Sequence, residues 1–450
     1  MEALWQDVRF GLRMLVKNRG FSIAAILTLG LGIGANTAIF SVVNAVLLRG
    51  LPYPEPQRLV VVQETVIGSG PEPVAYQNYL DLREQNHVFS ELAAYAGTDF
   101  TVSGEEKTDR IAGELTSDSY FPLLGVAPVL GRSFLPEENL LPGTHAVALI
   151  GYGLWQRQFG LDSAVLGRRL KINGKEYSII GVLPRGFRGL TGDAEVWIPI
   201  AMHDAAWPES AKFGFLTGRD IHWHRVLGRL KPGVSVAAAN SEVEALAARL
   251  RQEYPKEQKG RGARVLSASE YYVGRVRPAL LTLLGAVGFV LLIACSNVAN
   301  LLLVRAAARE KEFAVRMALG AGRGRLLAQL MIESLLIAVA GGILGLSLAL
   351  WGVQALPALL PLSLPTFARV GVDSQVFFFT AAISIFTGLL LGALPAIHAF
   401  RQNIGDFLKE GARGSEGNRA RRIGALIIVS EIALAIVPMI GACLMLRSLD

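Results

Sequence analysis

The dominant pattern along the chain is a series of long apolar runs separated by polar segments. The runs cover residues 21–48, 278–304, 326–350, 374–400 and 423–446. Each is close to the roughly 20 helical residues that a bilayer core requires. The third run contains one acid, Glu333, and the fifth contains Glu431. Core helices of a soluble protein rarely stay uncharged over such a length, so we predict five membrane-spanning helices.

The segment between the first two runs, residues 49–277, has the pattern of a folded mixed α/β domain. Its candidate elements are strands at 58–66 and 223–230, a hairpin at 167–183 and a helix at 234–254. The hairpin is expected to turn at Asn173-Gly174, a favoured pair for a two-residue turn. The segment is long enough to bury a core of its own, either as one domain or as two subdomains.

The composition narrows the class of protein. The chain is 52% hydrophobic and 18% charged, with a mean hydropathy of +0.40, which excludes a wholly soluble or a disordered protein. Both cysteines, Cys295 and Cys443, lie inside apolar runs, so a disulfide framework is excluded as well. The first run exceeds the apolar core of a signal peptide, and no small-residue cleavage site precedes Arg49. We therefore expect an uncleaved anchor.

Basic residues mark alternate ends of the predicted helices. The basic segments are 1–20, 305–325 and 401–422. The short loop 351–373 carries only Arg369. Because Lys and Arg are enriched in cytoplasmic loops, we predict that the basic segments are cytoplasmic and that 49–277, 351–373 and 447–450 lie on the other side. The formal net charge of +7 comes from these flanks and does not indicate nucleic-acid binding.

Motifs for catalysis and cofactor binding are missing from the sequence. Its one Gly-Lys pair, Gly174-Lys175, is followed by Glu176, so no phosphate-binding P-loop is present. H-E-x-x-H, metal-spaced cysteines and G-x-S-x-G are also missing. His222 and His224 form an H-x-H pair, but two histidines without a third ligand are more often structural than metal-binding. We expect no enzymatic activity, and no metal or cofactor in this chain.

Three predicted membrane helices carry G-x-x-x-G spacing, which lets helix backbones approach closely. The pairs are Gly30 with Gly34, Gly341 with Gly345, and Gly388 with Gly392. Together they predict a tight, shifting bundle. Glu333 and Glu431 are costly at bilayer depth unless they are paired. Each lies near a predicted cytoplasmic helix end, within reach of Arg325 or Arg422 respectively; a local ion pair is favoured, and a proton relay is the alternative.

The cytoplasmic segment 305–325 has the pattern of a short amphipathic element. Charged residues surround Phe313, Val315 and Leu319, and a Gly-Ala-Gly stretch then ends the helix. Such an element can dock a cytoplasmic partner, whereas the alternative is a solvated basic loop that only fixes topology.

The chain also echoes its own beginning. Asn18-Arg19 precede the first run and Asn418-Arg419 precede the fifth, and similar motifs, VLLRGL and LMLRSL, follow the two runs. This repeat predicts one full unit followed by the first helix of a second. On that interpretation the chain is a truncated piece of a longer, two-unit protein.

Several stretches resemble the FtsX/MacB-like permeases of ABC transport systems, and in particular their duplicated ADOP-type branch. GIGANTAIFSVVNAVLLRGLPYPEPQRLV (32–60) resembles the first helix of that branch and its exit. The stretches 119–139, 152–160, 179–189 and 225–236 resemble the MacB-like periplasmic core domain. SNVANLLLVRAAAREKEFAVRMALGAGRGRLLAQLMIESLL (296–336) resembles the FtsX-like permease core.

The resemblance implies an α-helical membrane protein of the bacterial inner membrane, with four spans per unit and a large mixed α/β periplasmic domain between the first two. It also implies a cytoplasmic ABC ATPase that binds ATP on a partner subunit or a fused domain, and pairing with a second permease unit. The residues implied to face the ATPase are Glu312, Arg316, Ala318, Gly320 and Ala321. Beyond the lipid bilayer, periplasmic proteins are a further expected class of partner.

The expected function is that of a permease subunit in an ABC-type export or mechanotransmission system, which relays ATP-driven motion to the periplasmic domain. One alternative is a membrane-anchored periplasmic sensor or scaffold without ATP coupling. The other is a proton-coupled secondary transporter, which requires Glu333 or Glu431 to titrate.

Overall fold

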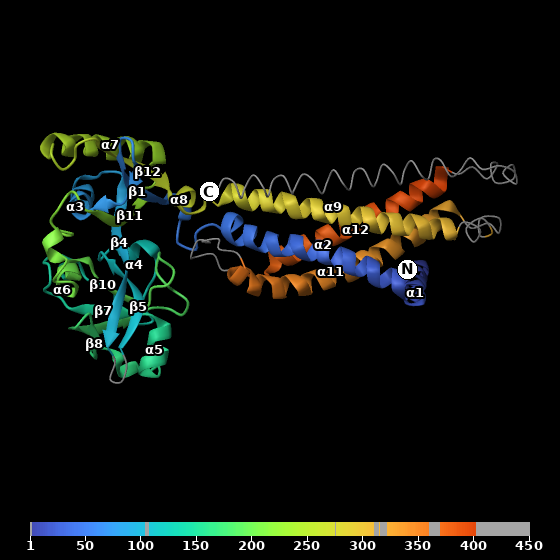
Figure 1. Cartoon of the computed structure of the whole chain (residues 1–450), viewed down its shortest axis with the longest axis horizontal. Coiled ribbons are helices and arrows are strands. Elements are labelled where there is room, and N and C mark those ends of the chain that lie inside the picture. The colour runs from blue at the N-terminus through green and yellow to red at the C-terminus, as the bar shows by residue number, and fades with distance from the viewer. Residues whose placement is uncertain are drawn as a thin grey trace. The chain divides into compact units, whose positions relative to one another are not determined.

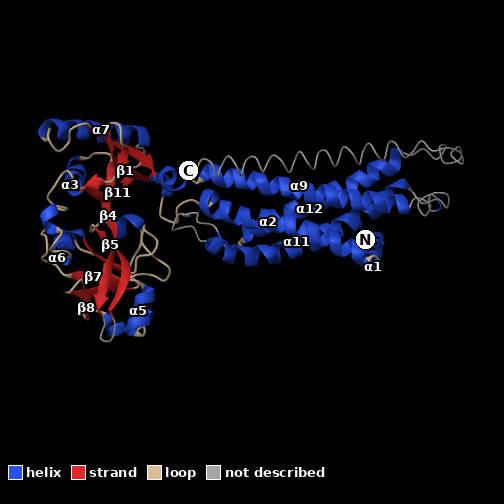
Figure 2. Ribbon diagram, in the orientation of Figure 1, coloured by secondary structure: helices blue, strands red, loops and turns tan. Residues whose placement is uncertain are grey.

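The computed structural model describes residues 2–103, 108–274, 276–309, 315, 322–359 and 370–401. These residues form two compact units, which Figure 1 colours along the chain. Residues 49–274 build the sheet unit, and the described parts of 2–48 and 276–401 build the helical unit. All strands of the described residues belong to the sheet unit, as the red arrows in Figure 2 show.

The sheet unit is built on one 12-stranded sheet. Its strands are β1 (Leu59–Val66), β2 (Gly70–Glu72), β3 (Val74–Ala75), β4 (Phe89–Ser103), β5 (Thr108–Thr116), β6 (Leu130–Gly131), β7 (Val147–Ile150), β8 (Arg169–Ile172), β9 (Lys175–Val182), β10 (Val196–Pro199), β11 (His222–Leu230) and β12 (Arg261–Ser267). The main path runs β12-β1-β11-β4-β5-β10-β7-β9-β6. The strands predicted at 58–66 and 223–230 are confirmed as β1 and β11, which pair antiparallel. The sequence pattern leaves open whether residues 49–277 form one domain or two subdomains. All the strands of the unit join one sheet, so two subdomains would have that sheet in common.

The hairpin predicted at Asn173-Gly174 is confirmed. Strands β8 and β9 pair antiparallel with Ile172 opposite Lys175. Both turn residues have positive φ, 48° at Asn173 and 85° at Gly174. A two-residue turn with both positions left-handed matches the twist of the flanking strands, and Asn-Gly adopts it with little strain.

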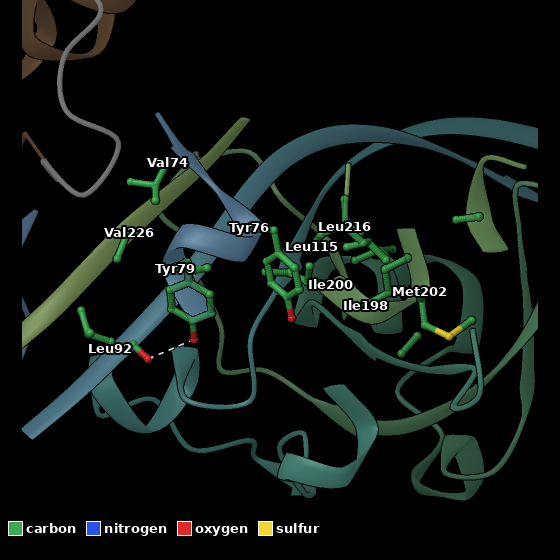
Figure 3. Close-up of a cluster of buried hydrophobic side chains, with 14 of the residues drawn as sticks. Val74, Tyr76, Tyr79, Leu92, Leu115, Ile198, Ile200, Met202, Leu216 and Val226 are labelled. Carbon is green, nitrogen blue, oxygen red and sulfur yellow. Dashed lines mark hydrogen bonds between the residues drawn. The ribbon is translucent and has the colours of Figure 1, made fainter. Parts of the chain in front are cut away.

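Both faces of the sheet are buried, because successive strand side chains alternate between two apolar clusters. On β1, Val60 and Val62 belong to one cluster, whereas Leu59 and Val61 belong to the other. Figure 3 shows part of the first cluster, in which the Tyr79 hydroxyl donates a hydrogen bond of 3.3 Å to the Leu92 carbonyl. The sheet unit therefore has a hydrophobic core of its own.

Helices cover the sheet. They are α3 (Tyr76–Gln85), α4 (Tyr120–Leu124), α5 (Tyr152–Phe159), α6 (His203–Ala206), α7 (Val236–Glu253) and α8 (Ala268–Val273). The helix predicted at 234–254 is confirmed as α7, which packs against β12. Its first turn is capped by the Ser235 hydroxyl, which accepts a hydrogen bond from the Ala238 N–H. The predicted apolar positions Val243, Leu246 and Leu250 are buried.

The helical unit consists of α1 (Glu2–Lys17), α2 (Arg19–Val43), α9 (Arg277–Ala308), α11 (Arg323–Leu359) and α12 (Ser374–Arg401). A π-helical stretch, Asn44–Leu48, continues α2. Among the described residues, four segments are long and apolar enough to cross a membrane: Arg19–Leu48, Arg277–Ala306, Leu327–Val353 and Ser374–Ala393. They fall on the first four predicted spans. The fifth, 423–446, and the Asn418-Arg419 echo lie outside the described residues.

The helix α1 is a feature that the charge pattern of residues 1–20 does not predict. Basic residues define that segment as a topological flank, but its apolar residues recur at helical spacing, as at Trp5, Val8, Leu12 and Leu15. The segment is therefore a helix with an apolar side, and α1 packs against α11 and α2.

Candidate functional site

A buried ion cluster lies at one end of the helical unit, where α9 ends and α11 begins. Glu333 of α11 is 4% exposed. Its Oε1 lies 2.5 Å from Arg305 Nη1, and its Oε2 lies 3.3 Å from Arg309 Nη1. The Arg305 guanidinium also stacks over the Phe21 ring of α2, 4.7 Å from its centroid. The carboxylate thus joins α11 to α9, and the Arg305 guanidinium joins α9 to α2. We name this group the Glu333 cluster.

The partners of Glu333 differ from the one that its sequence position suggests. Arg325 precedes Glu333 by eight residues, which is about 12 Å along a helix, whereas side chains on one helix meet three or four residues apart. The structure instead places Glu333 against two arginines of the neighbouring helix α9. Glu431, the other predicted intramembrane acid, lies outside the described residues.

A small cavity of about 20 Å³ adjoins the Glu333 cluster. It is lined by Leu302, Arg305, Ala306, Arg309, Leu330, Glu333 and Ser334. A space of this size holds one water molecule, and its charged lining offers the several polar partners that a buried water needs. The cavity is too small for a substrate, so the cluster has the character of a joint between helices.

The Glu333 cluster holds the first residues of the predicted coupling segment, 305–325. Arg305 and Arg309 lie at the start of that segment, and Glu333 follows its end on α11. The predicted coupling residues Glu312, Arg316, Ala318, Gly320 and Ala321 all lie outside the described residues. The described structure therefore shows what the segment is attached to.

The predicted glycine pairs of α2 and α11 face each other. A Cβ atom on Gly34 would lie 3.0 Å from the Gly345 carbonyl oxygen, and one on Gly345 would lie 2.8 Å from the Gly34 nitrogen. A Cβ on Gly341 would lie 2.9 Å from Leu29 Cβ, and one on Gly30 would meet Leu344. Since real Cβ atoms rarely come so close to other backbone, the two helices approach closely because these positions are glycine. We name this contact the glycine seam.

The third pair, Gly388 and Gly392 of α12, packs against an adjoining face of α11. A Cβ on Gly388 would lie 3.1 Å from Leu335 Cα, and one on Gly392 would lie 3.1 Å from Met331 Cα. Both contacts lie within one turn of Glu333. Helix α11 is therefore held closely between α2 and α12, and it carries the Glu333 cluster at one end.

Hydrogen bonds between the spanning helices reinforce this packing, and the sequence patterns did not single them out. Asn36 Nδ2 of α2 donates to the Val287 carbonyl of α9 at 2.7 Å. The hydroxyls of Thr37 and Thr380 lie 3.1 Å apart and join α2 to α12. The available signal is an amide or hydroxyl inside an apolar run, since such groups need a partner at bilayer depth.

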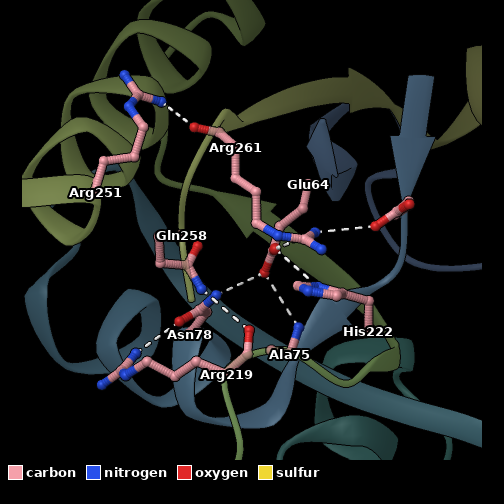
Figure 4. Close-up of polar contacts among 9 residues, drawn as sticks. Glu64, Ala75, Asn78, Arg219, His222, Arg251, Gln258 and Arg261 are labelled. Carbon is pink, nitrogen blue, oxygen red and sulfur yellow. Dashed lines mark hydrogen bonds and ion pairs between the residues drawn. The ribbon is translucent and has the colours of Figure 1, made fainter. Parts of the chain in front are cut away.

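In the sheet unit, the H-x-H pair takes part in a structural network. His222 Nδ1 lies 2.9 Å from Glu64 Oε2, while Glu64 Oε1 accepts hydrogen bonds from Ala75 N and Asn78 Nδ2 at 3.1 and 2.9 Å. Figure 4 shows these contacts together with Arg261, whose Nη1 lies 3.8 Å from the same Glu64 Oε2. Among the described residues, no group of three metal-ligating side chains comes together. Through Glu64, the His222 side chain ties β11 to β1 and to the backbone of β3.

His224 is fully buried, and neither of its ring nitrogens has a hydrogen-bond partner. It packs against Tyr76 and Trp223, with ring centroids 5.2 and 5.4 Å away. Burial, together with the smaller effect of the nearby His203, lowers the pKa of His224 to about 3. His224 is therefore neutral at ordinary pH and serves as part of the apolar core.

Two family models match the chain. The MacB-like periplasmic core domain matches residues 22–246, which is half of the chain. The FtsX-like permease C-terminal domain matches residues 284–404. The first match covers α2 and most of the sheet unit, and the second covers α9, α11 and α12.

Curated proteins that are similar to this chain are named as ABC permeases or as export ATP-binding/permease proteins. The pyoverdine export ATP-binding/permease protein PvdT of Pseudomonas syringae pv. tomato is 27% identical over 288 residues, covering 63% of this chain and 41% of that protein. The uncharacterized ABC transporter permease YknZ of Bacillus subtilis is 26% identical, covering 65% and 68%. The macrolide export protein MacB of Sodalis glossinidius is 26% identical, covering 85% and 56%. The chain spans about two fifths of the length of the first relatives that it matches.

Solved structures also match the chain. The periplasmic region of MacB from Actinobacillus actinomycetemcomitans has a TM-score of 0.38 at 11% identity and covers 51% of this chain and 96% of that one. The extracellular domain of the YknZ transporter has a TM-score of 0.34 at 17% identity, covering 46% and 99%.

Proposed function

This chain belongs to the family of the MacB-like periplasmic core domain and also carries an FtsX-like permease domain, and from that premise we propose that it is a permease subunit of an ABC-type export or mechanotransmission system. In this function a cytoplasmic ABC ATPase binds segment 305–325. The spanning helices then carry the motion of the ATPase to residues 49–277, where the work is done. A second permease unit completes the assembly, which lies in the bacterial inner membrane.

The observation that carries this proposal is the attachment of the coupling segment. Glu333 clamps the end of α9 to α11 on both sides of residues 310–321. A force applied to the segment therefore acts on both helices together. The close contacts at the glycine seam and at Gly388 and Gly392 pass it on to α2 and α12, because closely packed elements shift as units and do not deform continuously.

The nucleotide state of the ATPase would drive the motion. A partner shifts a conformational equilibrium only if it contacts two states differently. We propose that the ATP-bound partner favours one position of segment 305–325 and that the nucleotide-free partner favours another. Since this chain carries no P-loop, the energy of the cycle comes from the partner.

The two other candidate functions have less support. In a proton-coupled transporter, Glu333 would have to exchange protons with water, but it is 4% exposed and two guanidinium groups hold it. This arrangement suits a fixed structural charge. A scaffold without ATP coupling would need no coupling segment clamped between two spanning helices.

The experiment that tests the proposal replaces Glu312 and Arg316 with alanine. The full chain is purified in detergent from membranes of its native host, and the ABC ATPase that copurifies with it is quantified. We expect the wild-type chain to retain the ATPase and to change its ATP hydrolysis rate. The double variant should retain at least tenfold less ATPase than the wild-type chain. It loses two charged contacts, and each charge-assisted hydrogen bond contributes about 1.5–3 kcal/mol.

A matched control replaces Lys256 and Glu257, an exposed base and an exposed acid of the sheet unit. This variant removes the same two charges and should retain the ATPase fully. The proposal fails if the Glu312 and Arg316 variant retains the ATPase as well as the control does, or if the wild-type chain leaves ATP hydrolysis unchanged.

A further inference from the structure

Helix α1 has one side fixed against the helical unit. Gly11 is buried, and a Cβ atom there would lie 2.8 Å from Leu336 Cδ1 and 4.0 Å from Glu333 Cα of α11. Gly11 therefore faces the turn of α11 that carries the Glu333 cluster. The contact decides which residues of α1 point away from the bundle.

The side of α1 that faces away is apolar. Trp5 is 69% exposed, Leu12 is 49% exposed and Val16 is 62% exposed. At 100° per residue these three positions fall within about 40° of one another, on the side away from Gly11. Such a stripe on a helix of a folded unit needs a cover, because large exposed apolar surface marks a contact with a membrane or a partner.

A line of basic residues runs beside the apolar stripe. Arg9, Arg13 and Lys17 recur every fourth residue and are exposed. Among the side chains described in α1, Asp7 is the one acid, and it is half-buried on the opposite side of the helix. The outer surface of α1 therefore combines an apolar stripe that contains a tryptophan with an edge of positive charge. This combination is typical of helices that lie in an anionic membrane surface.

The joint to α2 fixes the level of α1 relative to the membrane. One residue, Asn18, separates α1 from the spanning helix α2. Asn18 Nδ2 donates to the Met14 carbonyl at 3.0 Å, and Ser22 Oγ donates to the Leu15 carbonyl at 2.9 Å. These bonds satisfy the last carbonyls of α1 and hold the two helices at a set angle. Because α1 joins α2 at the start of the first apolar segment, Arg19–Leu48, we expect α1 to lie near the membrane surface.

We propose that α1 is a binding surface for anionic phospholipid. Trp5, Leu12 and Val16 insert at the boundary between headgroups and acyl chains, and Arg9, Arg13 and Lys17 bind the headgroup phosphates. Charge complementarity and the direct continuation into a spanning helix select a lipid surface as the occupant. Through Gly11 the lipid-bound helix then supports α11 beside the Glu333 cluster.

The experiment measures the lipid next to Trp5. The full chain is reconstituted in nanodiscs of phosphatidylcholine that contain a minority of phosphatidylglycerol. Bromine on an acyl chain quenches the fluorescence of a nearby tryptophan. In one sample the phosphatidylglycerol is brominated, and in the other an equal amount of phosphatidylcholine is brominated. Trp351 is 78% exposed on α11 and contributes background. The Trp5 signal is therefore taken as the difference between the wild-type chain and the variant Trp5→Phe.

We expect brominated phosphatidylglycerol to quench Trp5 more strongly than an equal amount of brominated phosphatidylcholine. The combined variant Arg9→Gln, Arg13→Gln and Lys17→Gln should abolish that difference, since each basic residue near an anionic surface gives roughly a fivefold preference. A control that replaces the exposed Lys231, Lys256 and Lys259 of the sheet unit with glutamine removes the same charge and should keep the difference.

Three results would overturn the proposal. Equal quenching by the two lipids would mean that α1 does not select anionic headgroups. Trp5 that neither lipid quenches would place the stripe against protein or water. A combined variant that melts at the wild-type temperature and still prefers phosphatidylglycerol would show that the basic edge is not the binding group.

Discussion

At the scale of single residues, His224 carries a clear consequence for the response to acid. Burial holds its pKa at about 3, whereas an unfolded histidine has a pKa near 6.5. Between these values the unfolded chain binds a proton that the folded chain does not. Stability therefore falls as the pH drops below about 6.5, by at most about 1.4 kcal/mol per pH unit from this group.

We expect His224→Phe to weaken this acid sensitivity. The ring packs against Tyr76 and Trp223 and makes no hydrogen bond, so phenylalanine preserves these ring contacts. Some acid sensitivity should remain, because burial also lowers the pKa of His203. The measurement is urea unfolding of the full chain in detergent between pH 7 and pH 5, followed by tryptophan fluorescence.

The control for this prediction is His87→Phe, because the His87 side chain is 88% exposed. It replaces a surface histidine in the same way and therefore reports what the loss of an imidazole outside the core does. If His224→Phe and the wild-type chain lost equal stability on acidification, the neutral buried histidine could not be the cause.

Residue contacts were also the part of the site that the sequence could predict least. The need of Glu333 for a partner follows from an acid in an apolar run, but the choice of Arg305 and Arg309 depends on how α9 and α11 pack. Likewise, an H-x-H pair alone does not reveal that the His222 side chain contacts Glu64, which is far away in the sequence. Local spacing specifies which groups need partners, whereas the tertiary fold decides the partners.

At the scale of elements, the glycine seam predicts that alanine substitutions at two glycines of α11 have very different effects on stability. A Cβ on Gly345 would lie 2.8 Å from Gly34 N and 3.0 Å from Gly30 O, which are backbone atoms and cannot move aside alone. We expect Gly345→Ala to separate α2 from α11 and to destabilise the helical unit by about 1–3 kcal/mol. The measurement is thermal unfolding in detergent.

Gly352 of the same helix provides the matched control. No atom lies within 4 Å of a Cβ at Gly352, so Gly352→Ala should be neutral or stabilising by up to about 1 kcal/mol through helix propensity. A Gly345→Ala variant as stable as Gly352→Ala would contradict the close approach of the two helices.

Elements were predicted from the sequence better than contacts, for a physical reason. A spanning helix satisfies its own backbone and shows its length in one continuous apolar run, and a hairpin with Asn-Gly is encoded in a few residues. Helix α1 was missed because its apolar residues alternate with arginines, so that charge concealed the periodicity. Short strands such as β3 and β6, of two residues each, leave no local signal, since pairing with distant strands creates them.

At the scale of the whole molecule, the order of elements fixes which parts share a side of the membrane. The chain passes from α2 into the sheet unit and returns through α9. If each of the four apolar segments crosses once, the sheet unit and segment 310–321 lie on opposite sides, and the end of α12 returns to the side of that segment. This parity does not depend on the absolute orientation, which the basic flanks decide.

We therefore expect opposite results from reporters placed at two points. One point is the turn at Ile67, which is 87% exposed and tolerates an insertion because its backbone is not part of a strand. The other follows Arg401 at the end of α12. An alkaline phosphatase, which is active only outside the cytoplasm, should be active at Ile67 and inactive after Arg401. A green fluorescent protein that folds only in the cytoplasm should give the reverse pattern.

The two reporters separate the parts of this argument. If both points gave the same result, the number of crossings would be wrong, and segment 310–321 could no longer face away from the sheet unit. If the pattern were complete but inverted, the parity would hold while the positive-inside assignment failed. The permease function needs both, because an ATPase reaches the coupling segment only from the cytoplasm, and the relay has a purpose only if the sheet unit lies on the far side of the membrane.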